Sequence, residues 1–473
     1  MEMNHKMERP NAWDKYPTGK ERDKVFKFAE EYRKFLSTCK TERACNKFFI
    51  EKAKKAGFID INDAIKDGKT LKAGAKVYAD NMGKALALFV IGKEPLSGGL
   101  NILGAHIDSP RMDLKQNPLY EDTGLALLDT HYYGGIKKYQ WVTLPLALYG
   151  VICKKDGTTV EVCIGDKPGD PVFGVSDLLI HLSADRMTKT ASKVVEGENL
   201  NVLIGSIPME EASKAKRDKM KERVKKNILA ILLEELGIEE EDFLSAEIEV
   251  VPAGEARDYG LDRSMIMGYG HDDRVCAYPS FEAILEVKNP SKTSACLLVD
   301  KEEIGSVGAT GMQSKFFEYT VAELINLCGE YSELDLMRCM RNSKVLSSDV
   351  SAAFDPNYPE VNEKKNTAYF GKGLVFNKFT GRGGKSGSND ANAEYIGELR
   401  KIFDKNNVSF QTAELGKVDI GGGGTIAYIL ANYGMQVIDS GVAVLNMHAP
   451  WEIISKVDLY EAKKGYLAFL KEA

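Results

Sequence analysis

The stretch LNILGAHID, residues 100–108, is the segment that points most directly to the fold. Residues 100–105 form a short, mostly apolar run that ends directly in His106, Ile107 and Asp108. Apolar runs of this length, bounded by glycine and polar residues, are typical of buried strands in an α/β sheet. In an extended H-x-D unit both side chains point the same way, so Asp108 can orient the imidazole of His106. Taken alone, the unit also fits a buried histidine bonded to a neighbour.

Three more apolar runs lead into residues of metal-ligand type. Ligands of open α/β sheets bind outside the carboxyl ends of the strands, so residues at these positions are candidates for one site. The runs are 294–299, which ends in Asp300, Lys301, Glu302 and Glu303; 345–346, which leads through two serines to Asp349; and 441–447, which ends in His448.

Paired acidic residues supply the remaining candidates. Asp272 and Asp273 precede a helix expected over 275–287 and place a carboxylate at its N-terminus. Glu302 and Glu303 fit a solvated helix start, or a pair in which one carboxylate binds a metal and its neighbour takes a proton from the attacking water. Imidazoles and carboxylates without thiolates suit two divalent cations that share a carboxylate, and argue against a structural zinc site.

The order of segments predicts two domains. Helical periodicity over 26–35 and 41–53, followed by strands at 85–91 and 100–105, begins an α/β domain. From about residue 117 the chain becomes β-rich, and helices and short strands return near 257. We therefore expect a catalytic domain of residues 1–117 and 256–473, interrupted by a smaller domain of residues 118–255.

Composition excludes several classes of protein. The 473 residues carry a net charge of −6 and no long basic block, which argues against nucleic acid as a partner. No apolar run is long enough to span a bilayer, and no secretory signal opens the chain, so we expect no membrane partner and a cytoplasmic location. The eight dispersed cysteines fit reduced thiols. Gly384-Lys385-Ser386 lacks the upstream glycine of a Walker loop, because Phe379 stands there.

The ordered set H-x-D, D, E-E, D, H resembles the aspartyl aminopeptidase family (metallopeptidase family eighteen), a group of co-catalytic dizinc aminopeptidases. The resemblance implies a mixed-sheet, zinc-exopeptidase-like α/β domain with helices on both faces, interrupted by an inserted β-rich dimerisation domain. The segments that carry it are GAHIDSPRMDLK (104–115), FGVSDLLIHLSADR (173–186), GHDDRVCAYPSFEA (270–283), VDKEEIGS (299–306), SSDVSAAFDPNYPE (347–360), GGGGTIAYIL (421–430) and NMHAPWE (446–452).

The resemblance also implies residue roles. His106 and Asp349 would bind one metal, Glu303 and His448 the other, and Asp272 would bridge them. The catalytic residues would be Glu302 as general base, Asp108 as the partner that orients His106, and His181, which would reach the active site of a second subunit. Lys378, Gly424 and Thr425 would bind substrate. Two zinc ions are expected as cofactors, with cobalt or manganese as alternatives.

By this resemblance the chain hydrolyses the N-terminal residue from peptides. Lys378 predicts a preference for Asp or Glu at that position, although the segment after it departs from the family pattern. The family also implies a homo-oligomer, a tetrahedral dodecamer built from dimers. Two alternatives stay open: a related dimetal carboxypeptidase or deacylase, and a noncatalytic metal-bound assembly protein.

Overall fold

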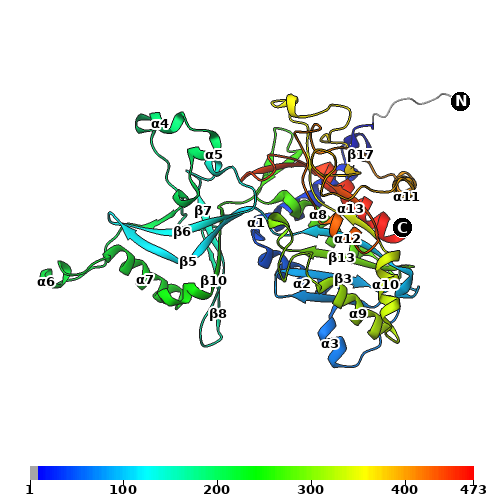
Figure 1. Ribbon diagram of the computed structural model, residues 1–473, viewed down its shortest axis with the longest axis horizontal. Coiled ribbons are helices and arrows are strands. Elements are labelled where there is room, and N and C mark those ends of the chain that lie inside the picture. Colours follow the sequence, from blue (N-terminus) through cyan, green and yellow to red (C-terminus); the bar gives the residue numbers. More distant parts are fainter. Residues whose placement is uncertain (1–8) are drawn as a thin grey trace. The chain divides into compact units, whose positions relative to one another are not determined.

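The computed structural model describes residues 9–473, which divide into two units (Figure 1). The first comprises the described residues through Ser109, with Ala256–Met447 and Glu452–Ala473. The second comprises Pro110–Glu255 and His448–Trp451. The domain boundary expected after residue 117 falls inside strand β5 (Arg111–Asp122), which pairs along its length within the second unit. Residues 1–8 of the expected catalytic segment lie outside the described residues.

A nine-stranded mixed sheet forms the centre of the first unit. Its four middle strands, β13, β4, β14 and β18, run parallel to one another. In spatial order the strands are β1 (Ile59–Asp60), β2 (Lys76–Asn81), β3 (Ala85–Val90), β13 (Thr293–Val299), β4 (Leu100–His106), β14 (Lys344–Ser347), β18 (Gln436–Gly441), β16 (Leu374–Asn377) and β17 (Phe410–Thr412).

Both faces of this sheet are buried, and each carries its own hydrophobic core. Alternate residues of β4 separate between them: Leu103 and Ala105 belong to one core, and Leu100 and Ile102 to the other. This division follows from the two-residue period of a strand and explains why the central strands are apolar throughout.

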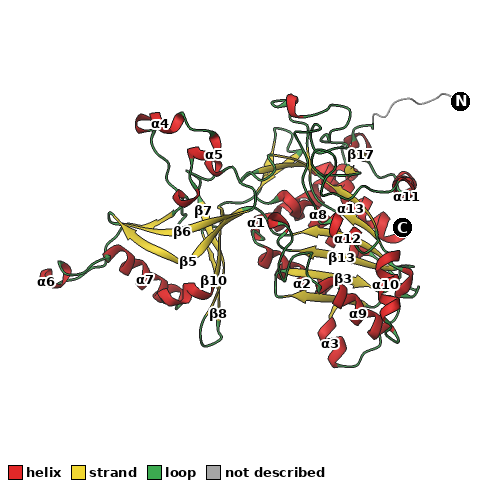
Figure 2. Cartoon of the chain, viewed as in Figure 1, coloured by secondary structure: helices red, strands yellow, loops and turns green. Residues whose placement is uncertain are grey.

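Helices cover both faces (Figure 2), which confirms the expected α/β class. The first core packs against α1 (Lys20–Thr38), α2 (Glu42–Lys55), α8 (His271–Glu286), α11 (Ala393–Lys405) and α13 (Lys456–Glu472). The second packs against α3 (Ile61–Lys66), α9 (Phe316–Cys328), α10 (Glu333–Asn342) and α12 (Ala427–Ala431).

A five-stranded sheet also belongs to the first unit, and it corrects one expectation. The run 441–447, expected as a single strand, contains the end of β18 at Gly441 and the separate strand β19, so the chain passes here from one sheet to the other. The strands are β11 (Arg257–Tyr259), β12 (Met265–Gly268), β20 (Glu452–Ser455), β19 (Ala443–Leu445) and β15 (Ser351–Ala352).

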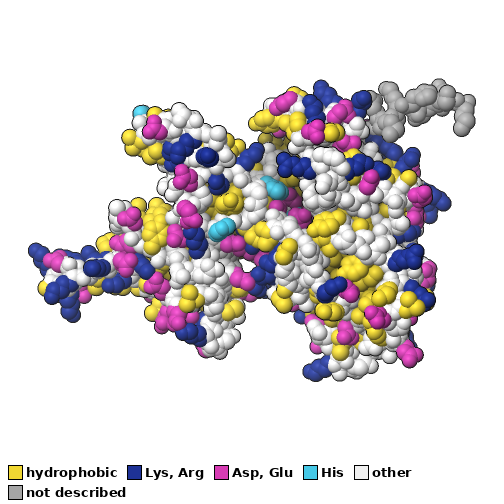
Figure 3. Space-filling view, viewed as in Figure 1, with side chains coloured by type: hydrophobic (Ala, Val, Ile, Leu, Met, Phe, Trp, Pro, Cys, Tyr) yellow, Lys and Arg dark blue, Asp and Glu magenta, His cyan; other side chains and the backbone are white. Residues whose placement is uncertain are grey.

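The second unit is built on a six-stranded antiparallel sheet. Its strands, in spatial order, are β8 (Thr159–Ile164), β7 (Leu146–Cys153), β10 (Ala246–Pro252), β5, β6 (Leu125–Tyr133) and β9 (Val202–Gly205). Its helices are α4 (Ala184–Met187), α5 (Ala191–Val194), α6 (Lys214–Arg217) and α7 (Arg223–Leu236). Lys and Arg side chains gather over α6 (Figure 3).

Across the described residues, every helix is too short or too polar to cross a bilayer. All eight cysteines are free thiols.

Candidate active site

The candidate site lies at the carboxyl edge of the parallel strands in the nine-stranded sheet. β4 ends at His106, whose register partner on β13 is Val299. β14 ends at Ser347 beside Gly104 of β4, and the N–H of Ser348 extends this pairing by donating to the Gly104 carbonyl at 2.6 Å. Because these strands are parallel, the acidic residues that follow β13 and β14 emerge beside His106.

Six side chains at this edge form three overlapping groups that could hold a metal ion. Within each group, one ligand atom from every residue lies within 4.8 Å of the others. The overlap suits two cations that share a carboxylate. The groups are His106 with Glu302 and Asp349; His106 with Asp272 and Glu303; and Asp272 with Asp273 and Asp349.

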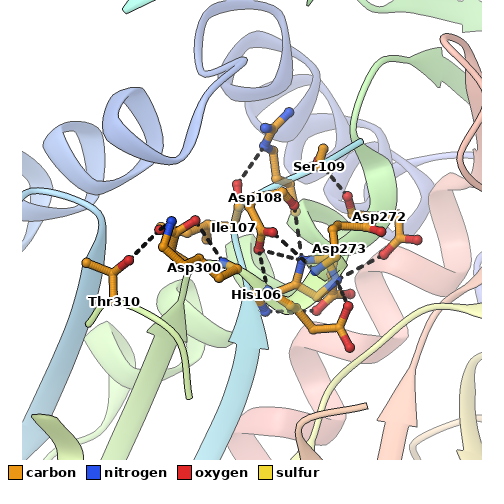
Figure 4. Close-up of polar contacts among 12 residues, drawn as sticks. His106, Ile107, Asp108, Ser109, Asp272, Asp273, Asp300 and Thr310 are labelled. Atoms are coloured by element: carbon orange, nitrogen blue, oxygen red, sulfur yellow. Dashed lines mark hydrogen bonds and ion pairs between the residues drawn. The ribbon is translucent and has the colours of Figure 1, made fainter. Parts of the chain in front are cut away.

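Asp108, which lies beside His106 in Figure 4, joins this histidine to the backbone of the two glutamates. Nδ1 of His106 lies 3.3 Å from Oδ1 of Asp108 and 3.0 Å from its backbone carbonyl oxygen. The two carboxylate oxygens of Asp108 each accept a backbone N–H at 3.2 Å, Oδ1 from Glu302 and Oδ2 from Glu303. A fully buried carboxylate can thus fix the imidazole and the glutamate backbone together.

Asp272 faces the other ring nitrogen of His106. Its Oδ1 lies 3.1 Å from Nε2 of His106. Its backbone is held on both sides: its N–H donates to Glu452 Oε2 at 3.0 Å, and its carbonyl accepts from Ser109 Oγ at 2.7 Å. Asp272 and Asp273 have non-helical backbone angles, so regular helix begins after them, as the sequence predicts.

Burial and like charges shift the pKa values in this cluster. Burial lowers the pKa of His106, but hydrogen bonds with Asp108 and Asp272 outweigh it and raise that pKa well above its ordinary value. Burial raises the pKa of Asp349 well above its usual range, and the charges of Glu302 and Asp272 raise it further. Crowded buried carboxylates are stabilised by a divalent cation bound among them, so the donor set fits such an ion.

His448 was expected to complete the ligand set. It follows β19 and belongs to the second unit, where its Nδ1 lies 2.9 Å from the carbonyl oxygen of Gly135. The three groups of candidate ligands found among residues 9–473 do not include it. The cluster of the first unit contains the other four expected ligands, the expected base Glu302, and Asp273.

His181 lies in the second unit, exposed on a short 3₁₀ helix over Ile180–Leu182. Three apolar side chains around it are strongly exposed: Leu179 at 54%, Ile180 at 68% and Leu182 at 68%. Exposed apolar side chains grouped in this way mark interaction surfaces.

The residues expected to bind substrate lie in two neighbouring loops of the first unit. Lys378 directly follows β16, and its Nζ donates to Asp390 Oδ1 at 2.7 Å. Gly424 is exposed, and the hydroxyl of Thr425 donates to Asp439 Oδ1 at 2.6 Å. The Gly423 N–H donates to the carbonyl of Thr380, which ties the two loops together.

Sequence reasoning missed two residues of this site. The family resemblance gives a role to Asp272 and none to Asp273, yet Oδ2 of Asp273 lies 3.4 Å from the backbone nitrogen of His106. Glu452 closes the motif NMHAPWE but received no role, although it is buried and holds the backbone of Asp272. Its position four residues after the expected ligand His448, in the same motif, was the signal that could have predicted a role for it.

The fold and the site define an α/β protein with a candidate metal centre, and comparison with known proteins places the chain more narrowly. The sequence model of the Aminopeptidase I zinc metalloprotease (M18) family matches residues 35–470. The chain therefore belongs to the M18 family and is a metallo-aminopeptidase.

Individual members of the family are similar to this chain over nearly its whole length. A probable M18 family aminopeptidase 1 of Clostridium acetobutylicum is 66% identical over 97% of this chain and 97% of its own length. The crystal structure of an M18 aminopeptidase from Thermotoga maritima matches with a TM-score of 0.92 at 44% identity, covering 99% of this chain and 100% of that one. The S. cerevisiae mApe1 dodecamer shares the fold, with a TM-score of 0.75 at 21% identity, over 94% of this chain and 96% of that one.

Proposed function

We propose that the chain removes the N-terminal residue from peptides through a two-metal site in which Glu302 is the general base. The network around Asp108 carries the proposal. One buried carboxylate contacts the imidazole of His106 and accepts the backbone N–H groups of both Glu302 and Glu303. A first metal ligand, a second metal ligand and the proposed base are thereby held in one arrangement.

The donor set supports two ions. We assign His106 and Asp349 to one, Glu303 and His448 to the other, and Asp272 to both. Zinc is the expected metal, as in the family, and cobalt or manganese would suit the same ligands. Two bound cations would polarise the scissile carbonyl and lower the pKa of the attacking water.

Glu302 is suited to proton transfer because it lies among the proposed ligands, while the two-ion assignment gives it no metal to bind. Its Oε2 lies 4.0 Å from Nε2 of His106, and its carboxylate is partly open to solvent. In the proposed reaction it takes the proton of the attacking water and returns it to the leaving amine.

Substitution of each of the two adjacent glutamates by glutamine separates the role of general base from that of metal ligand. We expect Glu302→Gln to lower kcat by about 10²- to 10⁴-fold while leaving the metal content nearly unchanged. Glu303→Gln, the matched variant, should lower metal content as well. Kinetics on a short peptide and metal analysis of both variants measure this; an active Glu302→Gln protein would contradict the base assignment.

Hydrolysis of N-acetylated peptides by the wild type would contradict the aminopeptidase assignment and favour a carboxypeptidase or deacylase.

A preference for acidic N-terminal residues is the second part of the proposal. Lys378 pairs with the half-exposed Asp390, and an acidic substrate side chain could replace that partner. We expect Lys378→Ala to reduce kcat/KM for Asp-peptides more than for Leu-peptides. Lys385→Ala is the matched control, because Lys385 contacts the other oxygen of Asp390 at 3.0 Å. Equal wild-type turnover of Asp-, Leu- and Lys-peptides would rule the preference out.

We further propose a homo-oligomer built from dimers, with the tetrahedral dodecamer as the expected form, acting in the cytoplasm. The exposed apolar residues around His181 support self-association through the second unit. The reduced state of all the cysteines is consistent with a reducing compartment.

A further inference from the structure

A buried carboxylate outside the ligand cluster lies in the same row of the central sheet. Asp439 is only 2% exposed and sits near the carboxyl end of β18. Its register partners are Ser347 on β14 and Asn377 on β16, and Ser347 in turn pairs with Gly104 on β4. His106 and Asp349 lie two positions beyond this row on their own segments. Asp439 is therefore one layer beneath the edge that carries the site.

The side chain of Asp439 holds the end of a glycine-rich loop. Thr425 donates its hydroxyl proton to Oδ1 of Asp439 at 2.6 Å. The same hydroxyl accepts the N–H of Ala427, the first residue of α12, at 3.2 Å. One hydroxyl group thus joins a central strand, the start of a helix and the end of the loop formed by residues 421–424.

That loop has no side chain of its own with which to fix its position. Gly422 has a φ of 114°, and a Cβ there would lie 2.7 Å from the carbonyl oxygen of Gly381, so backbone packs directly on backbone. Gly423 donates its N–H to the carbonyl of Thr380 at 3.0 Å. Thr425 is the first side chain after four glycines, and its bond to Asp439 is the side-chain tether that follows the loop.

Asp439 is also within electrostatic range of the proposed base. Burial, with the charge of Glu302, raises the pKa of Asp439 to about 7 although the Thr425 hydrogen bond lowers it. Its second oxygen, Oδ2, is buried and accepts no hydrogen bond from the described residues. Burying a carboxylate costs free energy, so we expect Asp439 to have a role, and its hydrogen bond with Thr425 indicates which one.

We propose that Asp439 is a positioning residue for substrate binding: through the Thr425 hydroxyl it fixes loop 421–424 at the carboxyl edge of the central sheet, the edge that carries the candidate metal ligands. The inference rests on the proposed function, because it takes this loop to contact the bound peptide. A loop held in its binding conformation binds more tightly than one that must be ordered each time. Loss of the tether should therefore appear mainly in KM.

The test removes the tether at each end. Thr425→Val keeps the shape of the side chain and removes the hydroxyl, and Thr425→Ser restores the hydroxyl. Loss of a hydrogen bond to a charged group changes an equilibrium constant by roughly 10- to 100-fold. We therefore expect Thr425→Val to raise KM about tenfold or more, with a small effect on kcat. Thr425→Ser should recover most of that loss. Thr320→Val, which removes a hydroxyl that donates to the Phe316 carbonyl within α9, should leave KM unchanged.

Two further measurements keep the test independent of turnover and of folding defects. Amide hydrogen exchange of the metal-free protein should be faster at residues 421–424 in Thr425→Val and in Asp439→Ala, and should return towards wild type in Thr425→Ser. The double variant Thr425→Val/Asp439→Asn should have a KM little higher than that of Thr425→Val alone, since both changes break the same hydrogen bond.

The outcomes separate this inference from the function on which it rests. A wild-type protein that is active on unblocked peptides, combined with equal KM values and equal exchange in Thr425→Val and Thr425→Ser, would overturn the role of Asp439 alone. Loss of metal in Thr425→Val in proportion to the loss of activity would overturn it too. A metal-loaded wild type that cleaves no peptide would instead overturn the proposed function.

Discussion

Asp108 is the residue on which most of the proposed chemistry depends. The H-x-D pattern predicts its position beside His106, because alternate side chains of an extended segment share a face. Its hydrogen bonds to the backbone of Glu302 and Glu303 could not be predicted, since they join segments almost two hundred residues apart in the chain. Local spacing predicts the pairing of His106 with Asp108, while the contact of Asp108 with the two glutamates depends on the order of the strands in the sheet.

Replacement of Asp108 by Asn tests this network. Asn offers one acceptor oxygen where Asp108 uses two, so at least one N–H of the glutamate pair loses its partner. Loss of a group that orients a metal ligand typically lowers metal affinity or activity by about 10- to 100-fold, and we expect Asp108→Asn to fall in that range. Chelator competition measures the affinity. Asp335→Asn, on the surface of α10, is the control; equal metal affinity of the two variants would contradict the assigned role.

At the level of elements, the apolar runs predicted the central strands well and failed at one boundary. The expected strands over 85–91 and 100–105 correspond to β3 and β4, because a strand buried on both faces is apolar throughout. The run 441–447 is equally apolar, yet it divides between two sheets. Hydropathy reports burial, and both parts of this run are buried, so it could not show where one sheet ends.

Gly441 marks that boundary and offers a test. A Cβ at this position would lie 1.7 Å from the backbone carbonyl oxygen of the proposed ligand Asp349. We expect Gly441→Ala to displace that backbone, to destabilise the protein by several kcal/mol, and to lower metal content.

Thermal unfolding and metal analysis measure both effects. Gly397→Ala is the matched change, because Gly397 is exposed within α11 and a Cβ there meets nothing within 4 Å. It should be neutral or stabilise the helix by about 0.5–1 kcal/mol. A Gly441→Ala protein as stable as Gly397→Ala would contradict the close approach.

At the scale of the whole molecule, the chain forms two units, and the sequence shows this through its change from α/β to β-rich texture and back. The self-association proposed for the second unit depends on contacts between subunits, which composition and periodicity do not reveal. His181 was proposed through family resemblance, and the structure adds that it is exposed among exposed apolar side chains.

Subunit mixing tests whether His181 acts across a dimer. Glu302→Gln and His181→Ala should each have little activity alone. Mixed and reassociated in equal amounts, they should regain about a quarter of wild-type activity, since half of randomly formed dimers are mixed and each contains one complete site. Glu302→Gln mixed with Glu303→Gln is the control and should stay inactive, because both defects fall in the same site. No gain in the first mixture would show that His181 does not serve a neighbouring subunit.

The strand order of the central sheet also has a consequence for biosynthesis. β4 lies between β13 and β14, so the strand that ends in His106 lacks both neighbours until the ribosome has made residues 110–255 and the strands after them. The proposed ligands that follow those strands, Glu303, Asp349 and finally His448, appear only in the later part of translation. A nascent chain therefore cannot assemble the proposed metal centre until nearly all of it has been made.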